Sequence, residues 1–223
     1  MSSFLTAIWQ ADGTFPSGSF AFSYGIEGVL AQRGSVGQPE LAELTRAILR
    51  QRWAGFDRVA VVRAFRAGDE PGAIGVLDHE VEAATLTEPL RGGSRRNGAA
   101  FLAAHARLGE ATAHRLREAI RARTCLGHLP VMQGAVWRAM GLSEADAQIV
   151  SGYTVASQVI AAAVRLGAIG ALQGQAVLQS CLPEIERFAA SAIDADAPLQ
   201  GFLPFLDIAS ARHARAELRL FVN

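Results

Sequence analysis

The fold is decided by residues 146–184, which read DAQIVSGYTVASQVIAAAVRLGAIGALQGQAVLQSCLPE. Between Asp146 and Glu184, the first and last residues of this stretch, the only charged residue is Arg165. By length alone such an apolar run can span a membrane. However, polar side chains and glycines interrupt the run, and Arg165 stands in its middle. We therefore predict two buried helices, separated near Gly167, in a protein without a membrane segment.

The glycines of this stretch also predict how the two helices pack. Gly170 and Gly174 have the G-x-x-x-G spacing, which lets two helix backbones approach closely. An isolated buried guanidinium is costly, so Arg165 needs a charged partner or an exposed position at an interface. We expect tight helix packing here, within the chain or between two copies, rather than a ligand site.

Outward from this stretch, the chain is rich in alanine, leucine and arginine, which are all strong helix formers. The order strand-helix-strand does not occur, and no fixed-period repeat is present. No shift of composition marks a domain boundary. The sequence therefore predicts an all-α fold, with residues 1–223 forming one domain and a single compact bundle of about nine helices.

Prolines, glycines and capping residues set the expected helix boundaries. Pro39 suits the first turn of a helix that runs to Ala67 with a bend at Gly55. Ser143, with Asp146 three residues later, resembles a capping box at the start of a helix that ends at Leu166. Pro183 is expected to open a separate short helix. The remaining helices are predicted over residues 20–32, 73–86, 90–108, 110–123, 131–140, 168–181 and 207–221.

The composition excludes several chemistries. Twenty-one basic residues balance 21 acidic ones, and every basic residue is arginine. Without lysine the chain cannot form a P-loop or a Schiff base. Cys125 and Cys181 are too few and too far apart for a disulfide scaffold or a zinc site, and no two histidines have helical metal-site spacing. We expect no catalytic residue, no metal ligand, no intrinsic cofactor and no enzyme activity.

The N-terminus, MSSFLTAIWQADG, has no basic region before its apolar residues. A secretory signal peptide begins with such a region. We therefore expect no signal peptide and a cytoplasmic protein.

Two charged clusters leave alternatives open. Eight arginines from Arg91 to Arg123 are accompanied by only Glu110 and Glu118. This arginine strip suits a nucleic-acid-binding regulator, a docking face for an acidic protein or a solvated helix surface, and we favour the last two. The acidic cluster is expected to be a solvated helix face; it consists of Asp78, Glu80 and Glu82.

A third alternative is a small-molecule hydrolase that pairs Ser17 or Ser19 with His128 or His213.

One set of motifs is more specific than the composition. Residues 12–27 read DGTFPSGSFAFSYGIE, and residues 207–213 read DIASARH, followed by RLF at 219–221. Three further blocks lie between them in order: Glu88 with Arg91 and Gly98; His128-Leu-Pro with Gly134 and Gly141; and Gln158 with AAAVRLG at 161–167 and Gly174-Gln175. In this order they resemble the UreF family of urease accessory proteins. The extreme C-terminus departs from that pattern, with Ala214 where the family has glutamate.

The resemblance implies an all-α, dimeric and non-catalytic urease maturation factor. Such a protein binds the accessory protein UreD, also called UreH, on one side and the GTPase UreG on another. The complex delivers nickel to apo-urease, and modulation of the GTPase is a further implied role. Nickel is then handled by the complex and not by an intrinsic site. We therefore expect protein partners and a homodimer, and neither nucleic acid nor a membrane.

The resemblance also implies where partners bind. The loop shaped by residues 15–20 would present Ser23, Tyr24 and Glu27. Gln158 and Arg165 would lie in a polar contact region at or near the dimer or a partner interface. The C-terminal helix would be ordered for docking by three residues, Asp207, Arg212 and His213.

Overall fold

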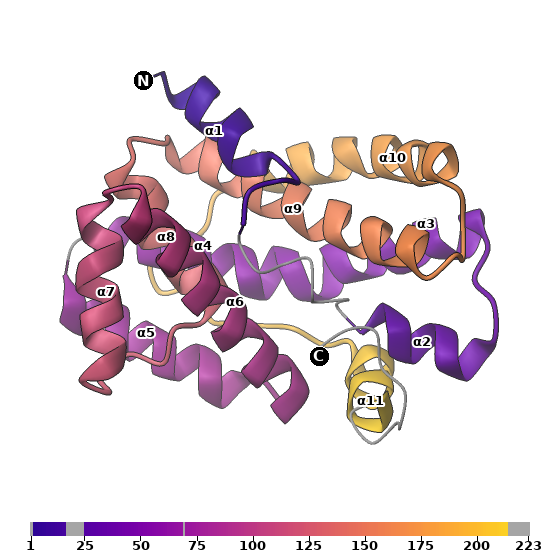
Figure 1. The fold of residues 1–223 in the computed structure, drawn as a ribbon, viewed down its shortest axis with the longest axis horizontal. Coiled ribbons are helices and arrows are strands. Elements are labelled where there is room, and N and C mark those ends of the chain that lie inside the picture. The colour runs from indigo at the N-terminus through magenta and orange to yellow at the C-terminus, as the bar shows by residue number, and fades with distance from the viewer. Residues whose placement is uncertain (1, 17–24, 69, 214–223) are drawn as a thin grey trace.

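The computed structural model describes residues 2–16, 25–68 and 70–213, and in these ranges every regular element is a helix (Figure 1). The segments α3, η2 and α4 follow one another without a break, so the described chain has ten continuous helices. This confirms the prediction of an all-α bundle. The elements are α1 Ser3–Ala11, α2 Ile26–Arg33, α3 Gln38–Ile48, the π-helix η2 Leu49–Asp57, α4 Arg58–Ala67, α5 Pro71–Ala84, α6 Glu88–Arg107, α7 Ala111–Arg121, α8 Leu129–Ala139, α9 Glu144–Arg165, α10 Ala171–Ala189 and α11 Pro204–His213.

The long helix from α3 to α4 begins and ends as predicted. Pro39 lies in its first turn, and the helix continues to Ala67. Around Gly55, where a bend was expected, the helix is π-helical over η2. A π-helix pairs each carbonyl with the amide five residues on, which loosens the regular ladder. Two carbonyls of η2 accept bonds from the C-terminal segment: Gln51 from the Phe202 N–H at 2.9 Å, and Gly55 from the Gln200 N–H at 2.8 Å.

The apolar side chains form two core clusters. The first gathers residues of α4 to α8 around Phe101 and Trp137. The second gathers residues of α2, α3, α10 and α11 around Trp53 and Ile185. The α3–η2–α4 helix and α9 contribute residues to both clusters, so these two long helices join them. The organisation as one domain stays a prediction.

Helix α9 carries the sequence features from which the prediction started. The Ser143 hydroxyl accepts a bond from the Asp146 N–H at 3.0 Å, as the capping pattern predicted. A Cβ placed on Gly174 of α10 would lie 2.9 Å from Ile160, which confirms close packing of α10 on α9. Among the described helices, α9 alone has the length and apolar composition of a membrane span. In its most apolar 18-residue stretch, 61% of the residues are buried inside the protein.

Two expectations about helices were wrong. Pro183 does not open a new helix but lies inside α10. Continuing the helix past Pro183 buries Glu184 and Ile185, and this packing outweighs the loss of one backbone hydrogen bond. The sequence also gave no indication of α1. The predicted helical residues 20–24 and 214–221 lie outside the described ranges.

The unpredicted helix α1 is fixed by a buried amide. Gln10 Oε1 accepts a hydrogen bond from Trp137 Nε1 at 2.9 Å and lies 3.1 Å from His105 Nε2. Burial lowers the pKa of His105 to about 4, so its imidazole is neutral near pH 7. Helix α1 therefore buries polar Thr6 and Gln10 while Phe4 and Ile8 are exposed. This arrangement inverts the pattern on which helix prediction depends.

Candidate functional site

The predicted partner-binding residues include Glu27, Arg165, Asp207 and Arg212, which come from helices that meet at one corner of the molecule, formed by α2, by the C-terminal end of α9 and by α11 (Figure 1). Gly25, just before α2, has a φ of +78°, and a Cβ there would lie 2.7 Å from Leu206 of α11. Only glycine fits this backbone and this close approach without strain. Gly25, near the end of the N-terminal motif, thus packs against Leu206 and Ser210 of α11, and we call this region the α2–α9–α11 corner.

Glu27 links α2 to α9 within this corner. Its side chain is 7% exposed, and it lines a surface groove together with residues at the end of α9. That groove is formed by Glu27, Leu30, Ala31, Gly34, Ser35, Val36, Leu166, Gly167 and Ala168. Arg165 is exposed in the last turn of α9, directly before the groove. A buried carboxylate and an exposed guanidinium therefore lie at the same end of α9.

The other predicted residues are placed as follows. Gln158 lies on α9 seven residues before Arg165, hence on the same side of the helix, and its Oε1 has no hydrogen-bond partner among the described residues. Arg212 is exposed near the end of α11. His213 ends α11, and its side chain lies outside the described part of the chain, as do Ser23 and Tyr24.

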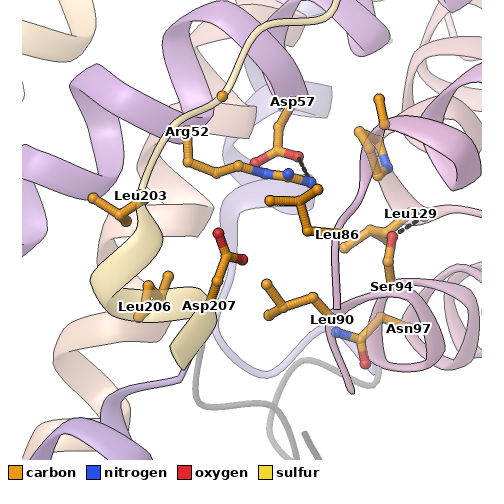
Figure 2. Close-up of a pocket in the computed structure, with 13 residues that line it drawn as sticks. Arg52, Asp57, Leu86, Leu90, Ser94, Asn97, Leu129, Leu203, Leu206 and Asp207 are labelled. Carbon is orange, nitrogen blue, oxygen red and sulfur yellow. Dashed lines mark hydrogen bonds and ion pairs between the residues drawn. The ribbon is translucent and has the colours of Figure 1, made fainter. Parts of the chain in front are cut away.

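Asp207, on α11, faces a small cavity that sequence reasoning missed (Figure 2). The cavity lies between α11, η2 and the start of α6, and Asp57 and Arg52 of η2 line it as well. Asp57 Oδ1 is 3.3 Å from Arg52 Nη2, and the Arg52 guanidinium lies 3.6 Å from the centre of the Phe56 ring. No motif pointed to Arg52 or Asp57, because they become neighbours of Asp207 only through tertiary folding.

Burial shifts the pKa of both carboxylates of this cavity in the same direction. Burial raises the pKa of Asp57, and Arg52 opposes that rise only in part. Burial also raises the pKa of Asp207, again against the attraction of Arg52. The cavity volume is about 60 Å³, which is room for a few water molecules or the end of one side chain. A substrate-sized molecule does not fit there.

The acidic cluster of α5 was expected to be a solvated face, and this was wrong. Asp78 is fully buried, and its carboxylate accepts the N–H groups of Leu126, Gly127 and His128 at 2.6, 2.7 and 2.9 Å. It thereby holds the loop between α7 and α8. The pattern could not reveal this role, because the three donors are backbone groups almost fifty residues away.

The neighbouring acids form ion pairs with other helices. Glu82 Oε2 is 2.7 Å from the buried His128 Nε2, and Glu82 Oε1 accepts from Arg95 at 2.6 Å. Burial lowers the pKa of His128, although Asp78 and Glu82 oppose this. Glu80 forms a two-pronged pair with Arg63 at 2.7 and 2.8 Å. These acids therefore join α5 to α4, α6 and α8.

The arginine strip is partly neutralised by two acids, Glu82 and Glu88. Arg91 and Arg95 pair with Glu88 at 3.0 and 2.8 Å. The exposed arginines of the strip are Arg96, Arg107, Arg115, Arg121 and Arg123.

The hydrolase alternative has no support from the structure, because the His128 imidazole is buried against Glu82, and Ser17 and Ser19 lie outside the described ranges. Within those ranges, no three His, Cys, Asp or Glu side chains form a group that could hold a metal ion.

The fold defines a class of protein, that of compact all-helical bundles. The UreF family model matches residues 37–182. The chain is 30% identical to the urease accessory protein UreF of Trichodesmium erythraeum (strain IMS101), over 98% of this chain and 96% of that protein. It is 29% identical to urease accessory protein UreF 1 of Brucella melitensis, over 95% and 89% of the two chains. It is 30% identical to UreF of Yersinia enterocolitica, over 95% and 94%.

The chain therefore belongs to the UreF family of urease accessory proteins. This confirms the resemblance read from the motifs, and it supports a role in urease maturation. The comparisons give no support to the nucleic-acid-binding alternative.

Proposed function

We propose that this protein is a non-catalytic scaffold that links a UreD/UreH-like accessory protein and a UreG-like GTPase to apo-urease for nickel insertion, and that it modulates the GTPase. Membership of the UreF family over nearly the whole chain is the observation that carries this proposal. In this function nickel is cargo of the assembled complex. The protein acts in the cytoplasm as a homodimer.

The composition fits a division of labour between the proteins. The chain contains no lysine, so the lysine of a P-loop must come from another subunit. The protein then contributes shape and charge complementarity, which set the speed and specificity of association. The α2–α9–α11 corner is the proposed docking region, since Glu27, Arg165, Asp207 and Arg212 come from its three helices.

Co-purification tests the docking region directly. A tagged full chain is co-expressed with the UreD-like and UreG-like proteins of the same organism, and the captured amounts are measured. Arg212→Glu reverses a charge at the corner and is expected to reduce capture of at least one partner about tenfold. Arg187→Glu is the matched control, since Arg187 is an exposed arginine on α10, outside both the corner and the arginine strip. Equal capture by both variants would place docking elsewhere.

Urease activity in cells tests the function itself. Deleting the gene is expected to abolish most urease activity in medium with limiting nickel, and the wild-type gene should restore it. Full activity after deletion would rule out the proposed function. Size-exclusion chromatography with light scattering tests the dimer, for which a mass of twice 23.6 kDa is expected.

A further inference from the structure

The cavity under α11 contains a buried carboxylate oxygen without a partner. Asp57 is only 6% exposed, and it lines the cavity. One of its oxygens faces Arg52 at 3.3 Å, while Oδ2 has no hydrogen-bond partner among the described residues. A buried polar atom without a partner destabilises the fold, and more so when it is charged. This oxygen is therefore an acceptor that can take a further hydrogen-bond donor.

The charges around the cavity do not balance. Asp207 lines the same cavity from α11, and its carboxylate makes no hydrogen bond or ion pair of its own within the described ranges (Figure 2). Two carboxylates thus share one guanidinium, that of Arg52. Stacking on Phe56 holds this guanidinium in place. The raised pKa values of both acids have the same origin, because burial outweighs the attraction of Arg52, to which His128 adds at Asp57. A second cation would stabilise both ionised acids.

The walls of the cavity are apolar, which restricts the kind of cation. Leu86, Leu90, Leu129, Leu203 and Leu206 line it, and its volume is about 60 Å³. Lysine and arginine carry a charged head on an alkyl stem, and such stems pack well along apolar surfaces. We propose that this cavity receives the cationic end of one lysine or arginine side chain from a partner protein, with the stem against the leucines and the head between Asp57 and Asp207.

Other ligands fit this site less well. A bare metal ion would find only two carboxylates, one of them already paired with Arg52, and no metal-binding group of three side chains occurs in the described ranges. An anion would meet two negative charges. The identity of the partner, a UreD-like or UreG-like protein, rests on the proposed function, whereas the preference for a cation rests on the cavity alone.

Small cations test the cavity without any partner. Thermal unfolding of the full chain is followed in n-butylammonium chloride and in methylguanidinium chloride, each compared with sodium chloride at equal ionic strength. We expect one or both organic cations to raise the melting temperature of the wild type in a saturable way. Asp207→Asn should remove this shift. Asp196→Asn, an exposed aspartate that does not line the cavity, should keep it. No saturable shift, or an equal shift in Asp207→Asn, would overturn the proposal.

Partner binding supplies the second test. The affinities of the purified UreD-like and UreG-like proteins are measured by calorimetry for the wild type, Asp207→Asn and Asp196→Asn. We expect Asp207→Asn to weaken one of the two complexes about tenfold or more, because removing one member of a desolvated charge pair mainly raises the dissociation rate. Asp57→Asn is the second variant and should weaken the same complex.

The two failures are distinguishable. Wild-type affinities for both partners in Asp207→Asn and Asp57→Asn would overturn the inference and leave the proposed function standing. No binding of either partner by the wild type would contradict the proposed function, while the small-cation experiment would still decide whether the cavity binds a cation.

Discussion

Two buried aspartates of this protein lie in regions of opposite character. Asp78 is fully buried and accepts three backbone N–H groups from the loop between α7 and α8. Asp57 is 6% exposed, faces one guanidinium at 3.3 Å and leaves Oδ2 without a partner in the described part of the chain. The first carboxylate meets its hydrogen-bonding needs within the chain, and the second does not.

The difference shows how burial and function can be separated. A buried charge that is fully hydrogen-bonded stabilises one fold. Breaking its hydrogen bonds would leave several polar groups unpaired in an apolar interior. A buried charge that is only partly paired weakens the fold and gains from a further partner. Two glycines lie beside these two regions and show the same difference. Gly98 packs against the loop that Asp78 holds, and Gly55 packs against the segment that borders the cavity.

The largest effect is expected at Asp78. Asp78→Asn keeps the size of the side chain but replaces one acceptor oxygen by an NH2 group, which faces backbone N–H donors. We expect the free energy of unfolding to fall by roughly 3–5 kcal/mol, since hydrogen bonds to charged groups contribute about 1.5–3 kcal/mol each. Urea unfolding followed by circular dichroism measures this. A loss below about 1 kcal/mol would remove the contrast with Asp57.

The next effect is expected at Gly98. In Gly98→Ala the new Cβ would lie 2.0 Å from the Gly127 carbonyl oxygen and 3.1 Å from the Leu129 N atom. Neither backbone atom can move freely, because Asp78 holds this loop. We expect a loss of about 2–3 kcal/mol in the same unfolding assay. Gly72→Ala is the control, since nothing lies within 4 Å of its added Cβ. Equal stability of the two variants would show that the loop yields.

The sequence predicted most of the fold for local reasons. Ser143 and Pro39 act through their own first turns, and Gly174 packs α10 against the neighbouring α9, whereas Gly170 of the G-x-x-x-G pair only caps α10. The failures have non-local causes. Pro183 remains helical because Ile185 is buried beyond it. Helix α1 turns polar Gln10 inward because Trp137 supplies a donor 127 positions away.

The candidate site was predictable only in part, for the same reason. Motifs from the two ends of the chain indicated Glu27 and Asp207, and these residues come from α2 and α11, which pack against each other. Arg52 and Asp57 belong to no motif, and the cavity exists only because the segment before α11 crosses η2. Asp78 looked like part of a solvated acidic face. Single residues whose partners are backbone groups leave no pattern to read.

A smaller effect is expected at Asp57, and it should depend on pH. Asp57→Asn loses a partly exposed ion pair but also loses a buried charge, so we expect a change of less than about 1 kcal/mol at pH 7. The pKa of Asp57 is raised above 3.8 in the folded state, so that state binds the proton more tightly. Wild-type stability from this group therefore falls as the pH rises from 3.8 through the raised pKa.

Unfolding measured at several pH values checks this sign. The Asn variant should gain stability relative to the wild type between about pH 4 and pH 7. The opposite slope would mean that Arg52 stabilises the ionised form of Asp57 more than burial penalises it.

The smallest effect on stability is expected at Gly55, although Gly55→Ala, like Gly98→Ala, places a new Cβ close to a backbone carbonyl oxygen. The new Cβ of Gly55→Ala would lie 2.7 Å from the Gln200 carbonyl oxygen, which belongs to an exposed segment that can move. Alanine gains about 1 kcal/mol of helix propensity, which offsets the strain, so the net change should stay within about 1 kcal/mol. The N–H groups of Gln200 and Phe202 should nevertheless lose their bonds to η2 and exchange hydrogen faster. Gly72→Ala should leave this exchange unchanged. Unaltered protection in Gly55→Ala would show that the segment beside the cavity is as firmly held as the loop on Asp78.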